Sequence, residues 1–342
     1  MTQPQLDLGF EAPLDLGSTE TPPKKTKTAQ PVESFQPGPA PVQDPANMAR
    51  ELDKHPDYRV LKRLAPQLHF DRAPQGPVIT VVLLDTETTG LDCAREKITE
   101  LAMLRVDVDS VSGLPCGPVT VFDGLEDPGK PIPEEIVKLT GITDEMVRGQ
   151  RLDEAQIDRL LQGVDLVVAH NAGFDRPFVE ARLHQFADLN WACSFADIDW
   201  KRQGQSSAKL EYLAMAQGWF YDAHRAEMDC HALLAVLCTC LPVSQTTGLA
   251  RLMAAGNSSA YRLEATGAPF EAKDALRARG YRWNAAVKVW HTQLATADLL
   301  DAECVWLKSA VYGQRSAQVQ VEQLDAKHRY STRDGLRSTR TL

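Results

Sequence analysis

Val81-Val82-Leu83-Leu84-Asp85-Thr86-Glu87-Thr88-Thr89-Gly90 is the stretch that decides the fold of this chain. Its four apolar residues predict a buried strand, and two carboxylates follow at the strand's end. Because side chains alternate along a strand, Asp85 and Glu87 should point to the same side. Neighbouring carboxylates repel each other unless a cation neutralises them, and oxygen ligands of this kind suit Mg²⁺ or Mn²⁺. On its own, the pair fits an acidic strand end exposed to water equally well.

The length and composition of the chain favour a soluble protein with two domains. Its 342 residues are enough for two domains and some disordered sequence. We find no apolar run of about 18 residues and no basic start followed by an apolar core, so we expect no membrane association and no secretory signal. Seven scattered cysteines without a CxxC pair suit buried thiols in the reducing cytoplasm.

The net charge of −9 is unevenly distributed along the sequence. Residues 51–242 carry 19 basic and 31 acidic side chains, whereas residues 243–342 carry 14 basic and 9 acidic ones. An acidic middle can concentrate cations, and a basic C-terminal third can meet phosphates.

Hydrophobic periodicity and breaker residues divide the chain into segments. Residues 1–50 contain nine of the 21 prolines and too little apolar sequence to fold, which predicts disorder. We expect an α/β protein with these segments: a disordered tail (1–54), a lead-in helix (55–77), a larger α/β domain (78–242), a linker with a helix (243–260), a small basic α+β domain (261–313) and a mobile tail (314–342). In the larger domain, strands are expected at 79–84, 98–107, 119–122 and 166–169, with helices at 133–140, 152–161, 174–186, 209–218 and 229–240.

Two further acidic sites follow the first along the chain. His170-Asn171-Ala172-Gly173-Phe174-Asp175 comes after a second buried strand and leads into a helix. His224-Arg225-Ala226-Glu227-Met228-Asp229 precedes an apolar helix, with the histidine on the loop and the aspartate in the first turn. Taken separately, an aspartate near a helix N-terminus is more often only a favourable contact with the helix dipole.

Together and in this order, the three motifs resemble the DEDDh branch of the DnaQ-like 3′–5′ exonuclease family. Asp85–Gly90 matches the first family motif, His170–Asp175 the second, and His224–Ala226 with Asp229 the third. The resemblance covers about residues 78–242 and implies a ribonuclease-H-like core, a mixed sheet flanked by helices. The chain is also similar to the proofreading exonuclease subunit of bacterial DNA polymerase III. Its C-terminal third, however, does not resemble the short polymerase-binding tail of that subunit. This difference favours an independent enzyme.

The resemblance implies a two-metal hydrolysis of phosphodiester bonds. Asp85, Glu87, Asp175 and Asp229 would hold two Mg²⁺ or Mn²⁺ ions, which activate water and stabilise the leaving oxygen. His224 would act as general base, because an imidazole titrates near working pH.

The resemblance also implies which neighbours position the substrate. The turn formed by Thr88, Thr89, Gly90 and Leu91 would contact the 3′-terminal nucleotide. Asn171 and Phe174 would meet the terminal sugar and bases, although Phe174 fits a packing role equally well. We therefore expect trimming of DNA 3′ ends, single-stranded ends above all, in repair or replication. The alternatives are an RNA 3′-exonuclease and a non-catalytic scaffold; the intact catalytic set argues against the scaffold.

A short motif near the N-terminus resembles the peptide by which bacterial proteins bind the polymerase sliding clamp. In Gln5-Leu6-Asp7-Leu8-Gly9-Phe10, the anchors would be Gln5, Leu6, Leu8 and Phe10. The similar Leu14-Asp15-Leu16-Gly17 favours compositional bias instead.

Basic and aromatic residues alternate in the C-terminal third. Arg277, Arg279, Arg282 and Lys288 interleave with Tyr281, Trp283 and Trp290. Such a mixture can bind nucleic acid, with cations on the backbone and rings on the bases. We favour the tryptophans as core residues of a small domain, and keep the four cations as candidate nucleic-acid contacts.

Overall fold

The computed structural model describes residues 44–342. The disordered tail and the clamp-like motif predicted within residues 1–43 lie outside the described residues. Helix α1, Pro45–Asp53, occupies the end of the segment predicted to be disordered, and none of its residues is buried. Residues 52–342 form one compact unit. Among the helices described, none combines the length and apolar character needed to traverse a bilayer.

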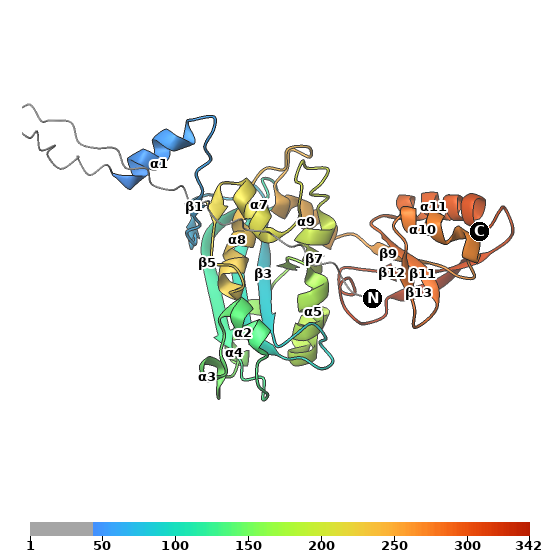
Figure 1. Ribbon diagram of the computed structural model, residues 1–342, viewed down its shortest axis with the longest axis horizontal. Coiled ribbons are helices and arrows are strands. Elements are labelled where there is room, and N and C mark those ends of the chain that lie inside the picture. The colour runs from blue at the N-terminus through green and yellow to red at the C-terminus, as the bar shows by residue number, and fades with distance from the viewer. Residues whose placement is uncertain (1–43) are drawn as a thin grey trace, which may run out of the picture. The chain divides into compact units, whose positions relative to one another are not determined.

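The larger domain is built on a six-stranded mixed sheet (Figure 1). Its central strand β3 pairs antiparallel with β4 and parallel with β6. In spatial order the strands are β2 (His69–Phe70), β5 (Leu114–Leu125), β4 (Ile98–Asp109), β3 (Val78–Thr88), β6 (Leu166–Ala169) and β7 (Trp191–Cys193).

Helices cover both faces of this sheet because the central strand is apolar on both sides. Val81 and Leu83 join one core cluster with α8 and α9, whereas Val82 and Leu84 join a second with α4 and α5. The helices are α2 (Glu134–Thr140), α3 (Asp144–Val147), α4 (Glu154–Leu161), α5 (Ala172–Arg182), η1 (His184–Asp188), α6 (Ser194–Asp197), α7 (Leu210–Ala216), α8 (Ala226–Leu237) and α9 (Gly248–Gly256). The predicted fold class, a mixed sheet flanked by helices, is confirmed.

The lead-in helix predicted over 55–77 is wrong. This segment instead contributes two short strands: β1 (Lys62–Arg63) pairs with β8 (Trp219–Phe220), and β2 pairs with β5. Four prolines in the segment explain the difference, because each removes a helical hydrogen-bond donor and restrains the residue before it.

The linker predicted over 243–260 also differs from the structure. The expected helix is present as α9, but it buries Leu249 and Leu252 completely against the core of the larger domain. The larger domain therefore extends beyond residue 242.

A second, smaller domain is an antiparallel sheet with helices on one face (Figure 1). Its strands, in spatial order, are β10 (Arg282–Asn284), β11 (Val289–Leu294), β9 (Ala260–Ala265), β12 (Gln318–Leu324) and β13 (Leu336–Thr341). Its helical segments are η2 (Phe270–Ala272), α10 (Lys273–Ala278), α11 (Ala297–Trp306) and η3 (Leu307–Val311).

The mobile tail predicted over 314–342 is wrong, because β12 and β13 belong to this second sheet. The alternation of apolar and polar residues in Gln318–Leu324 is the signal that identifies β12. Val319 and Val321 point into the core, whereas the intervening Gln320 points away.

Candidate active site

Three carboxylates meet at the C-terminal end of β3. Asp85 and Glu87 lie on the face of β3 that α8 covers, and Asp229 lies in the first turn of α8. One carboxylate oxygen from each lies within 4.8 Å of the other two. Within the described part of the chain, no hydrogen-bond donor reaches the side chain of Asp85 or Glu87. This group, Asp85 with Glu87 and Asp229, is called the acidic cluster below.

The acidic cluster holds its protons tightly in the absence of a cation. Burial, followed by the charges of Asp175 and Asp229, raises the pKa of Asp85 well above its usual value. Burial and the charges of Asp229 and Glu100 raise the pKa of Glu87 to about 8. Burial also raises the pKa of Asp229. These shifts identify a site that a cation would stabilise strongly.

The fourth predicted ligand, Asp175, is not one of the three carboxylates within 4.8 Å of one another, although its charge is the largest that acts on Asp85. It lies in the first turn of α5, and its side chain is almost fully buried. Its Oδ1 accepts hydrogen bonds from the backbone N–H of Thr86 (3.1 Å) and from the Thr86 hydroxyl (2.8 Å). Burial raises the pKa of Asp175 to about 7, although the bonds from Thr86 oppose the shift. Asp175 is therefore fixed to β3 from the opposite face of the sheet.

His224 lies on the loop before α8, beside the acidic cluster. Its side chain is exposed, and its backbone adopts a left-handed conformation with φ 65°. The backbone N–H groups of His224 and Arg225 donate to Asp229 Oδ2 at 2.9 and 3.2 Å. The loop conformation thus orients Asp229 and leaves the imidazole free to face a substrate.

Two further residues, Glu100 and Tyr221, position this loop, and sequence reasoning missed them. Glu100 on β4 is completely buried and accepts from Arg225 Nη2 at 2.7 Å and from the Ala226 N–H at 2.9 Å. The hydroxyl of Tyr221 donates to Asp229 Oδ1 at 2.8 Å. A glutamate within the apolar run of β4 was the available signal, since a buried charge requires a partner.

The Thr88–Leu91 turn is shaped by its own hydrogen bonds. The Thr88 hydroxyl donates to the Gly90 carbonyl at 2.7 Å, and the Thr89 hydroxyl donates to Glu96. Both threonines are buried, whereas Leu91 is 87% exposed. The apolar side chain that remains available at this turn is therefore that of Leu91.

Asn171 and Phe174 lie at the start of α5. Asn171 is exposed with φ 71°, and its side chain makes no capping hydrogen bond. Phe174 is half-buried, and its ring packs against Phe178 with centroids 5.1 Å apart. Packing thus occupies one side of the Phe174 ring.

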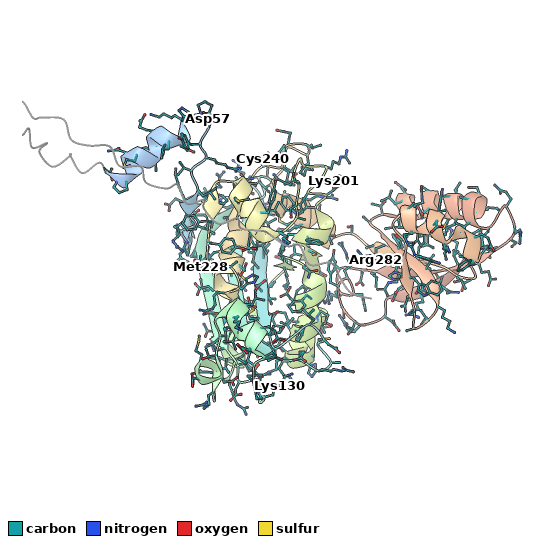
Figure 2. The ribbon with its side chains drawn as sticks, in the orientation of Figure 1. Asp57, Lys130, Lys201, Met228, Cys240 and Arg282 are labelled. Carbon is teal, nitrogen blue, oxygen red and sulfur yellow. The ribbon has the colours of Figure 1, made fainter. Side chains whose placement is uncertain are left out.

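The candidate cations of the smaller domain are not equivalent. Arg279 pairs with Glu303 (2.9 Å) and lies over the Trp306 ring at 4.5 Å, which is a structural role. Arg277, Arg282 and Lys288 are exposed; the Arg282 side chain is labelled in Figure 2.

The tryptophans of the smaller domain divide in the same way. Trp290 packs against the core of the domain, whereas Trp283 is 49% exposed. Trp290 therefore fits the expected core role better than Trp283 does.

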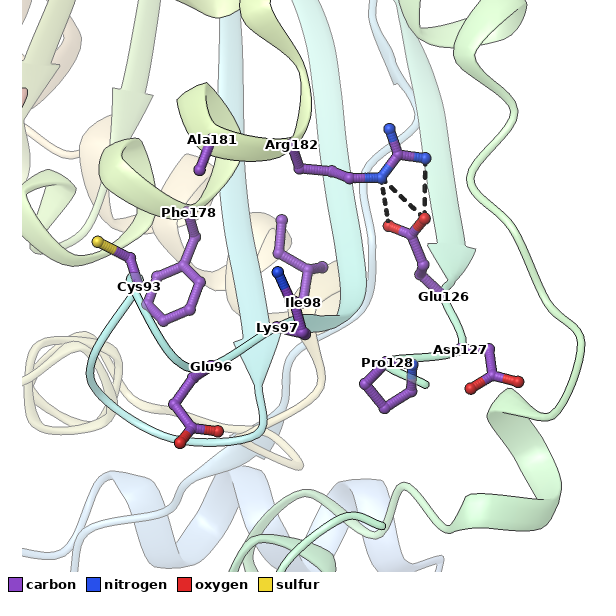
Figure 3. Close-up of a pocket in the computed structure, with 10 residues that line it drawn as sticks. All are labelled: Cys93, Glu96, Lys97, Ile98, Glu126, Asp127, Pro128, Phe178, Ala181 and Arg182. Carbon is purple, nitrogen blue, oxygen red and sulfur yellow. Dashed lines mark hydrogen bonds and ion pairs between the residues drawn. The ribbon is translucent and has the colours of Figure 1, made fainter. Parts of the chain in front are cut away.

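A cavity of about 270 Å³ lies elsewhere, beside Phe178 of α5 (Figure 3). Three of its charged residues are in ion pairs: Arg182 pairs with Glu126, and Glu96 pairs with Lys130. The cavity contains no member of the acidic cluster, so we assign it no chemistry.

Comparison with known proteins identifies the larger domain. The family model described as exonuclease, RNase_T, matches residues 82–237. This segment contains all three sequence motifs and the acidic cluster. Residues 82–237 belong to the DnaQ-like 3′–5′ exonuclease family.

Curated relatives of this exonuclease domain include DNA polymerase III of the PolC type. The protein from Listeria welshimeri is 35% identical over 102 residues, 29% of this chain and 7% of the relative. That from Halalkalibacterium halodurans is 37% identical over 100 residues, 29% of this chain and 6% of the relative. The chain thus spans less than a tenth of the length of these relatives.

Solved structures similar to the chain include two exonucleases with bound DNA. Exonuclease X in complex with 5′-overhanging duplex DNA is 23% identical, with a TM-score of 0.36, covering 50% of this chain and 99% of that one. Escherichia coli exonuclease I in complex with a dA16 oligonucleotide is 20% identical, with a TM-score of 0.38, covering 55% and 48%.

The acidic cluster fits the divalent ions that exonucleases of this family use. Its three contributors are all carboxylates, and hard oxygen ligands suit Mg²⁺ or Mn²⁺ better than softer metals. Among residues 44–342 no donor reaches the carboxylates of Asp85 and Glu87, so their lone pairs are available to a cation.

Proposed function

We propose that the exonuclease domain hydrolyses DNA from the 3′ end, with two divalent ions and His224 as general base. The observation that carries this proposal is the acidic cluster, whose three carboxylate oxygens lie within 4.8 Å of one another. A site with so much negative charge at one point is unfavourable unless cations neutralise it. The adjacent exposed imidazole of His224 supplies the proton acceptor that hydrolysis needs.

The side chains of the domain have separate roles in the proposed reaction. Asp85, Glu87 and Asp229 would hold the ions, with Asp175 as the fourth ligand. When bound, the ions lower the pKa of a water molecule and stabilise the leaving 3′-oxygen. His224 accepts the proton of the attacking water at a ring nitrogen.

The surroundings keep these groups in place. Tyr221 and the loop N–H groups fix the orientation of Asp229, and the buried Glu100 holds the start of α8. The exposed side chain of Leu91 would meet the terminal base.

Two observations favour DNA over RNA as the substrate. Curated relatives of the domain include PolC-type DNA polymerases, and Gln5–Phe10 resembles a clamp-binding peptide. The proposed reaction takes place at the sugar–phosphate backbone, whose contacts carry no sequence information, so we expect little sequence preference.

The proposed reaction is tested with 5′-labelled single-stranded DNA, duplex DNA and single-stranded RNA of one sequence, each with Mg²⁺ or Mn²⁺. We expect stepwise shortening from the 3′ end, fastest on single-stranded DNA, and none in EDTA. Faster degradation of RNA would instead favour the RNA 3′-exonuclease.

Arg277, Arg282 and Lys288 remain candidate contacts: replacing all three by alanine should weaken DNA binding and reduce its salt dependence.

We also propose that the N-terminal peptide around Leu6, Leu8 and Phe10 binds the sliding clamp, with Gln5 as its polar anchor. Its apolar anchors match the kind of peptide that docks into a hydrophobic pocket. Deleting residues 1–12 should abolish retention on an immobilised bacterial clamp and leave hydrolysis of single-stranded DNA unchanged. Equal retention of the deleted and full-length chains would contradict the proposal.

A further inference from the structure

The loop between β12 and β13, residues 325–335, returns from the smaller domain to the exonuclease domain. We call it the β12–β13 loop. Its first contact is with the edge of the exonuclease sheet, where the backbone N–H of Trp191 on β7 donates to the Ala326 carbonyl at 2.9 Å. Because β7 is the last strand on that side of the sheet, the loop covers an otherwise unpaired edge.

The main contact of the loop is with Arg176, the residue that follows Asp175 in α5. The Arg176 side chain has no exposed surface. Its Nη1 donates to the Arg329 carbonyl and its Nη2 to the Lys327 carbonyl, both at 2.6 Å. Its Nε donates to Glu180 Oε1 at 2.6 Å, and its guanidinium lies 5.2 Å from the Trp191 ring centroid.

The loop also closes over Glu180, the ion-pair partner of Arg176. The Ser331 hydroxyl donates to Glu180 Oε2 at 2.6 Å, and Arg333 Nη2 lies 3.4 Å from Oε1. Without the loop, Arg176 would lose its two shortest carbonyl acceptors and Glu180 two of its partners. A buried charge that has lost its partners strongly destabilises a protein.

A second path links the loop to the start of α5. Arg329 and the Tyr330 hydroxyl, which donates at 2.7 Å, both bind Asp197 Oδ1. The other oxygen of Asp197 accepts from the Cys193 N–H at 2.8 Å. The sulfur of Cys193 in turn accepts from the N–H of Ala172, the first residue of α5, at 3.3 Å.

We propose that Arg176 is a positioning residue for Asp175, held in place by the β12–β13 loop, so that the smaller domain completes the metal site. This inference rests on the proposed function, because it takes Asp175 as a metal ligand. Asp175 and Arg176 are consecutive in the first turns of α5, so any rotation of that end of the helix moves the Asp175 carboxylate. Arg176 acts on the metal site through this geometry, as outer partners of metal ligands do.

The test compares Mn²⁺ binding and turnover in full-length variants. Arg176→Met keeps most of the length of the side chain and removes its hydrogen-bond donors. Arg176→Lys keeps the positive charge but lacks the planar guanidinium that donates to several acceptors at once. Arg340→Met is the matched control, because Arg340 pairs with Asp301 inside the smaller domain. Mn²⁺ affinity is measured by the paramagnetic resonance of free Mn²⁺, and folding by circular dichroism at the same temperature.

We expect Arg176→Met to raise the Mn²⁺ dissociation constant about 10- to 100-fold. Turnover at low Mn²⁺ should fall in parallel and recover at saturating Mn²⁺, with partial rescue in Arg176→Lys and wild-type values in Arg340→Met. A purely structural role would lower the melting temperature without changing the dissociation constant, and that result would overturn the inference.

If Arg176→Met does not fold, the double variant Tyr330→Phe with Ser331→Ala decides. It removes only two loop hydroxyls, those that reach Asp197 and Glu180, and should raise the dissociation constant in the same direction by a smaller factor. Unchanged Mn²⁺ binding by this folded variant would overturn the inference. Asp85→Asn in the same assay separates a failure of this inference from a failure of the proposed function. If Asp85→Asn also binds Mn²⁺ normally, the proposed metal site itself is wrong.

Discussion

Asp85→Asn is expected to reduce hydrolysis of single-stranded DNA by about 10⁴-fold, a loss typical of removing one member of a catalytic group. Four acidic neighbours raise the pKa of Asp85: Asp175, Asp229, Glu87 and Glu100. Asp85 therefore lies at the centre of the negative charge that binds the ions. Asparagine keeps the shape of the side chain but removes the charge. The measurement is single-turnover hydrolysis at saturating Mg²⁺.

The same substitution should stabilise the protein in the absence of metal. Burial and like charges raise the pKa of Asp85 in the folded state, whereas in the unfolded chain it titrates near 4. Between these values the folded state binds more protons, so its stability is present at low pH and is lost as the pH rises. Asparagine does not titrate and avoids this loss, which amounts to about 1.4 kcal/mol for each unit of pKa shift.

The expected pattern distinguishes lost chemistry from misfolding. In EDTA, Asp85→Asn should unfold at a higher temperature than the wild type at pH 8, with a smaller difference at pH 5. Mg²⁺ should stabilise the wild type more at pH 8 than at pH 5, and the variant hardly at all. Asp107→Asn, on β4 and hydrogen-bonded to Thr80, is the matched control and should retain activity. An inactive Asp85→Asn that is also less stable in EDTA would contradict this account.

The chemistry of the site was predictable because the residues of each motif lie within a few positions of one another in the sequence. Asp85 and Glu87 are two residues apart on one strand, so the period of the strand alone places both on the α8 face. The first turn of α8 likewise follows from the apolar run after Asp229. Such short-range relations need no knowledge of the tertiary fold.

The supporting contacts were not predictable because they join residues far apart in the chain. Glu100 reaches Arg225 across 125 residues, and Arg176 reaches the carbonyl of Arg329 across 153. Nothing in the local sequence of Arg176 distinguishes it from a solvent-exposed helix residue. The polar segment that holds it was predicted to be a mobile tail for the same reason: its order depends on a partner in another domain.

His224→Asn is expected to lower kcat about 10²- to 10⁴-fold while leaving Mn²⁺ and DNA binding intact. Asparagine is chosen because the backbone at this position has φ 65°, a conformation that asparagine tolerates better than alanine does. The N–H of residue 224 can then still donate to Asp229, so the metal ligand keeps its orientation. The carboxamide cannot accept a proton as an imidazole does, and only the base is lost.

Comparing His224→Asn with His224→Ala and His184→Asn isolates the imidazole from the loop. His184 is exposed on η1, so its replacement should leave kcat unchanged. His224→Ala adds backbone strain at a positive φ, so it should weaken Mn²⁺ binding through Asp229 as well as lower kcat. If His224→Asn cleaves DNA at nearly the wild-type rate, the proton acceptor lies elsewhere. If it loses Mn²⁺ binding as fully as Asp85→Asn, His224 acts on the metal ligands and is not the base.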